Sequence, residues 1–210
     1  MLGLRSAAVA GLFYPADAAQ LRHEIELLLA NVEHRHEMPK ALLVPHAGYM
    51  YSGAIAASAY ESLQRNGSSI RRVVLIGPAH RVAVKGVALP SATLFDTPLG
   101  SVSLDEDLRR TILKLPQVSI SEVAHVKEHA LEVQLPFLQT VLNDFTLLPL
   151  VVGMTPSEAV AEVLEQVWGG KETLIVISSD LSHYLPYAVA KRVDAETVQS
   201  ILQLEQLTDH

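Results

Sequence analysis

Short runs of apolar residues alternate with longer segments of helical periodicity along this chain. Four continuous apolar runs are typical of buried strands, at 40–46, 71–80, 145–153 and 172–183. The segments between them repeat apolar residues at helical spacing and predict helices over 17–32, 53–67, 105–115, 128–144, 155–170 and at least the second half of 186–207. Strands that are apolar throughout and separated by helices indicate an α/β fold, in which a mostly parallel central sheet carries helices on both faces.

The segment 85–104 interrupts this alternation. Glycine, proline and serine separate short β-like pieces there, which predicts an antiparallel excursion from the sheet. The sequence shows no internal repeat, low-complexity tract or linker. We therefore expect residues 1–210 to form a single domain.

The chain has 210 residues, no cysteine and a formal net charge of −7. We expect no nucleic-acid partner, because no basic cluster exists to neutralise phosphates. A chain without cysteine forms neither disulfides nor thiolate zinc sites, which fits a reducing compartment. No apolar segment approaches the ~20 residues that cross a bilayer. Gly11 and Pro15 interrupt the short N-terminal apolar stretch that faintly resembles a signal peptide. We expect a cytoplasmic protein that does not enter a membrane.

Three of the four predicted strands end in the same manner. His46 follows "LLVP", His80 follows "VLIGPA", and Asp180 and His183 follow "LIVISS". Because ligands of open parallel sheets bind outside the carboxyl ends of the strands, these side chains are expected to converge at one edge. A single histidine after a strand is ordinarily a loop residue, but the repetition at three strand ends favours a shared site.

Neutral imidazoles beside an open position suit a divalent transition metal such as Fe(II), Zn or Cu. A third ligand is normally needed, and Asp180 is the carboxylate that would complete a two-histidine-one-carboxylate set. His183 would then serve as an acid or base near neutral pH. The Ser178–Ser179 pair suggests a hydrolase, but no G-x-S-x-G motif surrounds it.

A further histidine pair lies in "HVKEH", which matches the H-x-x-E-H pattern of inverted zincins through His125 and His129. Such a protease needs a third ligand and a cleft around this segment. We favour a different interpretation, in which His129 and Glu132 lie three residues apart on one helix face and orient a ligand above the sheet.

Six ordered motifs together resemble the Memo family, the B component of the AmmeMemoRadiSam set: "AGLFYP" (10–15), "VPHAGYMYSG" (44–53), "IGPAH" (76–80), "EHALEVQLPFL" (128–138), "LPLVVG" (148–153) and "SSDLSHY" (178–184). The resemblance spans essentially the whole chain. It implies the fold of class III extradiol dioxygenases, which use non-haem Fe(II) to open catechol-type rings, and a functional link to a radical SAM partner.

The resemblance also assigns roles residue by residue. His46 and His80 match metal-ligand positions, and His183 matches the catalytic acid or base. Three more residues match the lining of the same pocket: Asp180, His129 and Glu132.

Family members continue beyond this chain to a C-G motif, whose cysteine is the third metal ligand. This sequence has no cysteine, so the third ligand is absent from it. Either the chain is a fragment or the protein lacks that ligand, and the helical pattern of 193–207 favours a C-terminally incomplete chain. We expect the metal to be Fe(II), or alternatively Cu or Zn, and the absence of the cysteine leaves this expectation open.

The partner of the pocket is expected to be an unknown small molecule or a peptide. A second hypothesis uses the same pocket without catalysis, as an adaptor that binds a peptide, a phosphorylated side chain or a partner protein. His129, His183 and Tyr49 would donate hydrogen bonds to an anion. Gly48 and Gly53 would let backbone N–H groups approach it closely.

Overall fold

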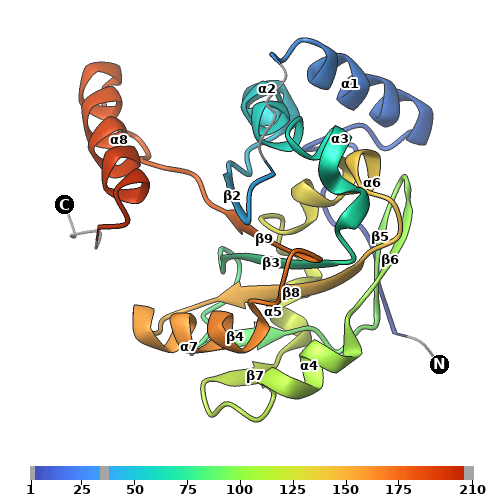
Figure 1. The fold of residues 1–210 in the computed structure, drawn as a ribbon, viewed down its shortest axis with the longest axis vertical. Coiled ribbons are helices and arrows are strands. Elements are labelled where there is room, and N and C mark those ends of the chain that lie inside the picture. Colours follow the sequence, from blue (N-terminus) through green and yellow to red (C-terminus); the bar gives the residue numbers. More distant parts are fainter. Residues whose placement is uncertain (1–2, 34–37, 206–210) are drawn as a thin grey trace. The chain divides into compact units, whose positions relative to one another are not determined.

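The computed structural model describes residues 3–33 and 38–205 (Figure 1). The chain divides into two compact units, Met1–Ser179 and Asp180–His210. The first unit holds these strands: β1 (Leu4–Arg5), β2 (Ala41–Val44), β3 (Arg72–Pro78), β4 (Val87–Leu89), β5 (Leu94–Thr97), β6 (Gly100–Ser103), β7 (Val118–Ile120), β8 (Thr146–Val152) and β9 (Thr173–Ser178). Its helices are α1 (Ala18–Ala30), α2 (Tyr49–Tyr60), α3 (Leu63–Asn66), η1 (Gly67–Ser69), α4 (Glu106–Ile112), α5 (Glu122–Val126), η2 (Glu132–Gln134), α6 (Leu135–Val141) and α7 (Ser157–Val167). The second unit contains α8 (Tyr187–Leu202).

The central sheet has six strands in the order β2-β9-β3-β8-β4-β7. The pairs β2–β9, β9–β3 and β3–β8 are parallel, while β4 runs antiparallel to β8. In this register Val44 at the end of β2 lies opposite Ser178 at the end of β9. The predicted mostly parallel sheet is therefore confirmed, and the carboxyl ends of β2, β9 and β3 lie at one edge.

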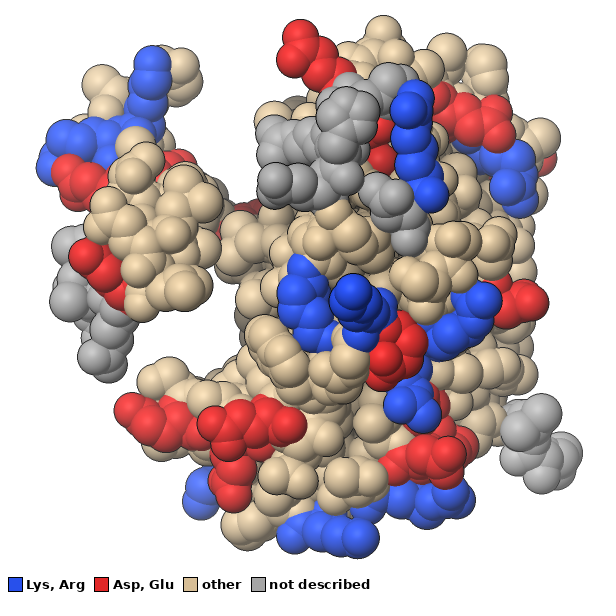
Figure 2. Space-filling model, in the orientation of Figure 1, with Lys and Arg blue, Asp and Glu red and all other residues tan. Residues whose placement is uncertain are grey.

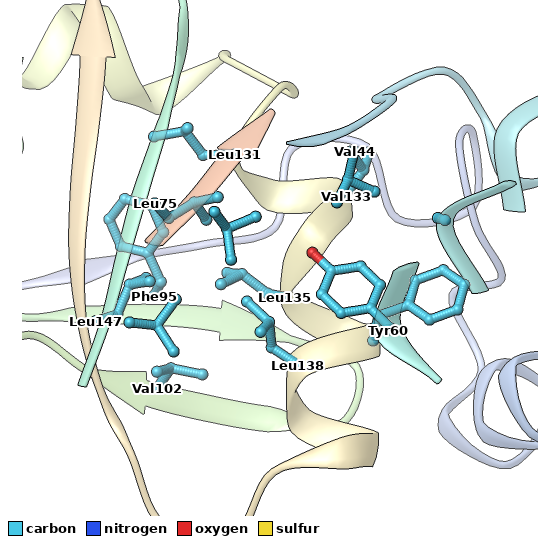
Figure 3. Packing of buried hydrophobic residues seen from close by; sticks show 14 of the residues in the cluster. Val44, Tyr60, Leu75, Phe95, Val102, Leu131, Val133, Leu135, Leu138 and Leu147 are labelled. Carbon is cyan, nitrogen blue, oxygen red and sulfur yellow. The ribbon is translucent and has the colours of Figure 1, made fainter. Parts of the chain in front are cut away.

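Alternate residues of the central strands face two separate cores. On β3, Val73 and Leu75 pack into a cluster with α1, α2 and α6, whereas Val74 and Ile76 pack into a cluster with α4 and α7. Figure 3 shows part of the first cluster, where Leu131 and Leu135 lie on the side of Leu75 of β3 and Val133 lies near Val44 of β2. Helices cover both faces, as the apolar strands predicted.

Helix α1 illustrates why the periodicity was informative. Leu21, Ile25 and Leu29 are spaced four residues apart and are buried on one face. Asp17 caps the helix, because its side chain accepts a hydrogen bond from the Gln20 N–H at 2.8 Å. A local cap and a regular apolar stripe agree here, so prediction and structure differ by one or two residues.

The predicted helix over 128–144 is wrong in its first part. Residues 128–131 are irregular, and helical structure begins with η2 at Glu132 and continues into α6. The carboxylate of Glu128 accepts hydrogen bonds from the backbone N–H groups of His129 and Ala130, at 2.9 and 3.0 Å, and so competes with a helical ladder. Pro136 lies at the start of α6 instead of kinking a longer helix. His129 and Glu132 therefore do not share a helix face.

The expected antiparallel excursion is present. Strands β5 and β6 form an antiparallel hairpin, and β1 pairs with β5 in a three-stranded sheet.

Of the helices within the described residues, none has the length and apolar character needed to cross a bilayer. Figure 2 shows basic and acidic side chains interspersed over the face in view.

Candidate metal centre

His46 reaches the carboxyl edge of the sheet because Pro45 ends β2 directly before it. The imidazole is buried, with 3% of its surface exposed, and its Nδ1 lies 3.1 Å from Ser178 Oγ. The Ser178 hydroxyl donates its proton to the Ala130 carbonyl at 2.6 Å and accepts from Gln134 Nε2 at 2.8 Å. The hydroxyl proton is thus used elsewhere, so His46 Nδ1–H must donate to Oγ. This tautomer places the lone pair of the neutral ring on Nε2.

His80 follows β3 by two residues, and Glu128 holds it at two points. Glu128 Oε1 lies 2.9 Å from His80 Nδ1, and Oε2 accepts the backbone N–H of His80 at 2.7 Å. A carboxylate only accepts, so Nδ1–H donates and the lone pair of the neutral ring is again on Nε2. Burial by itself would raise the pKa of Glu128, but hydrogen bonds from Ala130 N–H and His80 outweigh it, and the pKa is lowered.

His129 enters the same cluster from the irregular loop before η2. Its ring centroid lies 4.7 Å from that of His80 and 5.6 Å from that of His46, and the Phe13 ring packs against it at 4.8 Å. Burial is the main cause that lowers the pKa of His129. Its Nδ1 is buried 3.3 Å from Glu128 Oε1 without hydrogen-bond geometry, and no hydrogen-bond partner for it lies among the described residues.

Within the described part of the chain, these three histidines are the only group of three or more His, Cys, Asp or Glu side chains whose donor atoms lie close enough together to hold a metal ion. One donor atom from each of His46, His80 and His129 lies within 4.8 Å of the other two. Neutral imidazole nitrogens in this arrangement can ligate one divalent transition metal. The sequence predicted His46 and His80 as ligands but gave His129 a lining role, because the expected helix paired it with Glu132. No local sequence pattern indicates this placement, which depends on the Glu128 carboxylate contacting both the His80 ring and the backbone N–H of His129.

Glu132 lies in a buried polar network and not at an open surface. Its exposed fraction is 0%, and it forms an ion pair with Arg5. Its oxygens accept hydrogen bonds from three further groups: the Tyr14 hydroxyl at 2.6 Å, Ala8 N–H at 2.7 Å and Val9 N–H at 2.9 Å. These contacts join the N-terminal segment to the loop that carries His129.

Tyr49 is the first residue of α2, three residues after His46. Its hydroxyl donates to the Val133 carbonyl at 2.7 Å, and the side chain is 5% exposed. Burial raises the pKa of Tyr49 well above its ordinary value. The backbone N–H of Tyr49 donates to the Phe13 carbonyl at 2.8 Å, which ties the start of α2 to the residue that packs on His129.

Asp180 and His183 belong to the second unit. Within it, His183 Nε2 lies 3.7 Å from Asp180 Oδ2, and the two side chains are 58% and 24% exposed. Ser182 N–H donates to Asp194 Oδ1 at 2.9 Å and links the segment before α8 to that helix. The predicted catalytic pair is therefore formed as a pair, and its catalytic role stays a prediction.

The inverted-zincin alternative is wrong. Helix α5 ends at Val126, so the two histidines of "HVKEH" do not lie on one helix. His125 is 2% exposed, its Nε2 lies 2.9 Å from the Ala88 carbonyl, and burial lowers its pKa to about 4. A ring that donates its N–H to a buried carbonyl in this way is a structural residue.

A cavity of about 910 Å³ lies at the opposite edge, where β3 and β8 begin. Its buried carboxylate, Asp105, is engaged by Arg72 Nε at 3.1 Å, by the Thr146 hydroxyl at 2.8 Å and by Leu108 N–H at 3.0 Å. These contacts stabilise the junction between α4 and the sheet. The histidine cluster is the better candidate for a metal-binding site, because its donor atoms converge.

Comparison with known proteins finds a family to which this sequence is similar. The family model described as Memo-like protein matches residues 5–208. A MEMO1 family protein of Aquifex aeolicus (strain VF5) is 40% identical over 205 residues, which cover 96% of this chain and 75% of that protein. MEMO1 family proteins of Ignicoccus hospitalis and Methanococcoides burtonii are each 36% identical, and each match covers 96% of this chain and 76% of the relative.

Proposed function

Because the chain belongs to the Memo family, we propose that His46, His80 and His129 hold one divalent transition-metal ion in a site of the class III extradiol dioxygenase type. The observation that carries this proposal is the convergence of one donor atom from each ring within 4.8 Å. His129 would supply the third ligand, in the role that the family resemblance assigns to a cysteine.

The surroundings of the rings fit a metal. Metal-bound histidines characteristically donate their other N–H to a carboxylate or to another fixed acceptor, which sets the tautomer. His80 does so to Glu128 at 2.9 Å and His46 does so to Ser178 at 3.1 Å. The lowered pKa of His129 favours its neutral form at pH 7, which has the lone pair that a ligand needs.

We propose Fe(II) as the metal, with Cu and Zn as the alternatives that imidazole ligands also suit. A bound Fe(II) would supply the redox chemistry for O₂-dependent opening of a catechol-type ring. The roles of His183 in moving a proton and of Asp180 as its partner rest on the family resemblance and on their 3.7 Å contact.

Metal binding is tested first. Protein purified without oxygen is titrated separately with Fe(II), Cu(II) and Zn(II), and bound metal is measured by elemental analysis. We expect one equivalent for wild type and a large loss of affinity for His46→Ala, His80→Ala and His129→Ala. His23, exposed on α1, gives the matched control His23→Ala. A wild-type protein that holds no stoichiometric metal, or three variants that all bind like wild type, would refute the site.

The reaction is tested separately by oxygen consumption with a panel of catechols. We expect turnover with the Fe(II)-loaded protein and its loss in His183→Ala. If the protein binds metal stoichiometrically but turns over none of the catechols, the metal site is supported and the dioxygenase reaction is refuted. That result would support the non-catalytic binding module.

A further inference from the structure

The loop at residues 127–131 carries both Glu128 and His129, yet it has no regular secondary structure. Buried backbone groups need partners, and in this loop the partners are both backbone groups and side chains. The Glu128 carboxylate accepts the N–H groups of His129 and Ala130, and the Ser178 hydroxyl donates to the Ala130 carbonyl at 2.6 Å. The position of this loop therefore depends in part on side chains, some of which come from elsewhere in the chain.

Arg5 is the most distant of these side chains in sequence. From β1 its Nε donates to the His125 carbonyl at 3.0 Å, and its Nη2 donates to the Glu128 carbonyl at 2.6 Å. Its Nη1 pairs with Glu132, and the residue is 4% exposed. One guanidinium thus bridges the end of α5, the residue that anchors His80, and the start of η2.

The charge of Arg5 is compensated where it lies. Glu132 neutralises it and is itself held by the hydroxyl of Tyr14 and two backbone N–H groups. The guanidinium also lies over the Phe95 ring, with its central carbon 5.1 Å from the ring centroid. A planar fork with several fixed donors can hold two carbonyls and one carboxylate at once, whereas an ammonium is a compact point charge.

We propose that Arg5 is a positioning residue for the metal site, which it serves by fixing the backbone of the loop that carries Glu128 and His129. This inference rests on the proposed metal-binding function. If Arg5 has this role, replacing it changes the metal affinity and the ligand geometry of protein that is still folded, in addition to lowering the free energy of unfolding.

The test compares Arg5→Lys with wild type, since lysine retains the positive charge beside Glu132 but loses the fork that reaches the two carbonyls. The matched control is Arg72→Lys, because Arg72 also pairs with a buried carboxylate, Asp105, but lies where β3 begins and not where it ends. Circular dichroism and thermal unfolding first establish the temperature range in which each variant is folded. Co(II) affinity and the visible Co(II) spectrum are then measured in that range.

We expect Arg5→Lys to bind Co(II) about 10- to 100-fold more weakly than wild type, as measured for changes in groups that orient metal ligands. Its Co(II) spectrum should differ from wild type, whereas Arg72→Lys should match wild type in both measurements. A loss of thermal stability with unchanged affinity and spectrum would overturn the inference, because it would show a purely structural role. If wild type itself binds no Co(II), the proposed metal site fails and this inference fails with it.

Arg5→Lys could fail to fold, because its charge is buried. In that case the double variant Arg5→Met/Glu132→Gln is measured instead, with Glu132→Gln alone as its control. The double variant removes both charges of the buried pair, and the amide oxygen still accepts hydrogen bonds from the N-terminal segment. The double variant also removes the guanidinium from the two carbonyls. Wild-type affinity and spectrum in this variant would overturn the inference, and weakened binding with an altered spectrum would support it.

Discussion

The carboxylate of Glu128 accepts hydrogen bonds from His80 through both its oxygens, with Oε1 2.9 Å from the ring Nδ1 and Oε2 2.7 Å from the backbone nitrogen. Glu128→Gln keeps the size of this side chain but removes its charge and turns one acceptor into a donor. We expect the variant to bind a divalent metal about 10- to 100-fold more weakly than wild type, because His80 loses its orienting acceptor. Isothermal titration with Zn(II) measures the change.

The control for this substitution is Glu122→Gln, on the exposed surface of α5. Glu122 accepts a hydrogen bond from the Ser91 hydroxyl at 2.9 Å, and no hydrogen bond or ion pair among the described residues joins it to the histidine cluster. Its variant should bind the metal like wild type. Equal affinities for Glu128→Gln and wild type would show that His80 does not depend on this carboxylate.

Ser178→Ala tests the tautomer of His46. The substitution removes the acceptor for His46 Nδ1–H and leaves the buried Ala130 carbonyl and Gln134 amide each with one partner fewer. We expect the free energy of unfolding to fall by about 1–3 kcal/mol. In wild-type protein without metal, nitrogen NMR shifts should show protonated Nδ1 and unprotonated Nε2 for His46, and the variant should show a mixture of tautomers. A wild-type ring protonated at Nε2 would contradict the assignment.

The sequence was most informative where local and global patterns agree. The apolar run before Pro45 marks β2, the run through Ile76 marks β3, and parallel pairing brings the residues after them together. The approach of His46 and His80, whose ring centroids lie 5.1 Å apart, could therefore be predicted from the strand ends.

The place of His129 could not be predicted in the same way. Its segment has helical periodicity, but the Glu128 carboxylate takes the N–H groups that a helix would need, and periodicity does not report that competition. The pairing of Arg5 with Glu132 joins residues 127 positions apart. Such a contact follows from the packing of the whole unit, so no local pattern indicates it.

His125 predicts a pH dependence of stability. Burial lowers its pKa in the folded protein to about 4 from an ordinary value of 6.5. Between these values the unfolded state binds a proton and the folded state does not, so stability is constant above about pH 6.5 and falls as the pH drops toward 4. The loss from this residue should reach about 2–3 kcal/mol at pH 4.5. Urea unfolding of metal-free protein at pH 7 and pH 4.5 measures it.

Other groups also titrate in this range, so the contribution of His125 is isolated by difference. His125→Gln keeps an N–H donor for the Ala88 carbonyl but has no titratable group. The variant should lose less stability than wild type between the two pH values, by about the same 2–3 kcal/mol. Equal losses in the two proteins would contradict the lowered pKa of His125, because they would mean that this residue binds its proton equally well in the folded and unfolded states.

Tyr49→Phe separates the observed contact of this hydroxyl from the anion-binding role that the sequence suggested. The hydroxyl donates to the Val133 carbonyl at 2.7 Å in a buried position, so the variant should lose about 1 kcal/mol of unfolding free energy. Affinity for Zn(II) and for inorganic phosphate should stay within about twofold of wild type, since hydrogen bonds that stay intact keep the histidines in place. Tyr51→Phe, at a side chain that is 76% exposed, is the control and should change neither property. Weaker phosphate binding in Tyr49→Phe with unchanged stability would instead place this hydroxyl in a ligand pocket and favour the non-catalytic binding module.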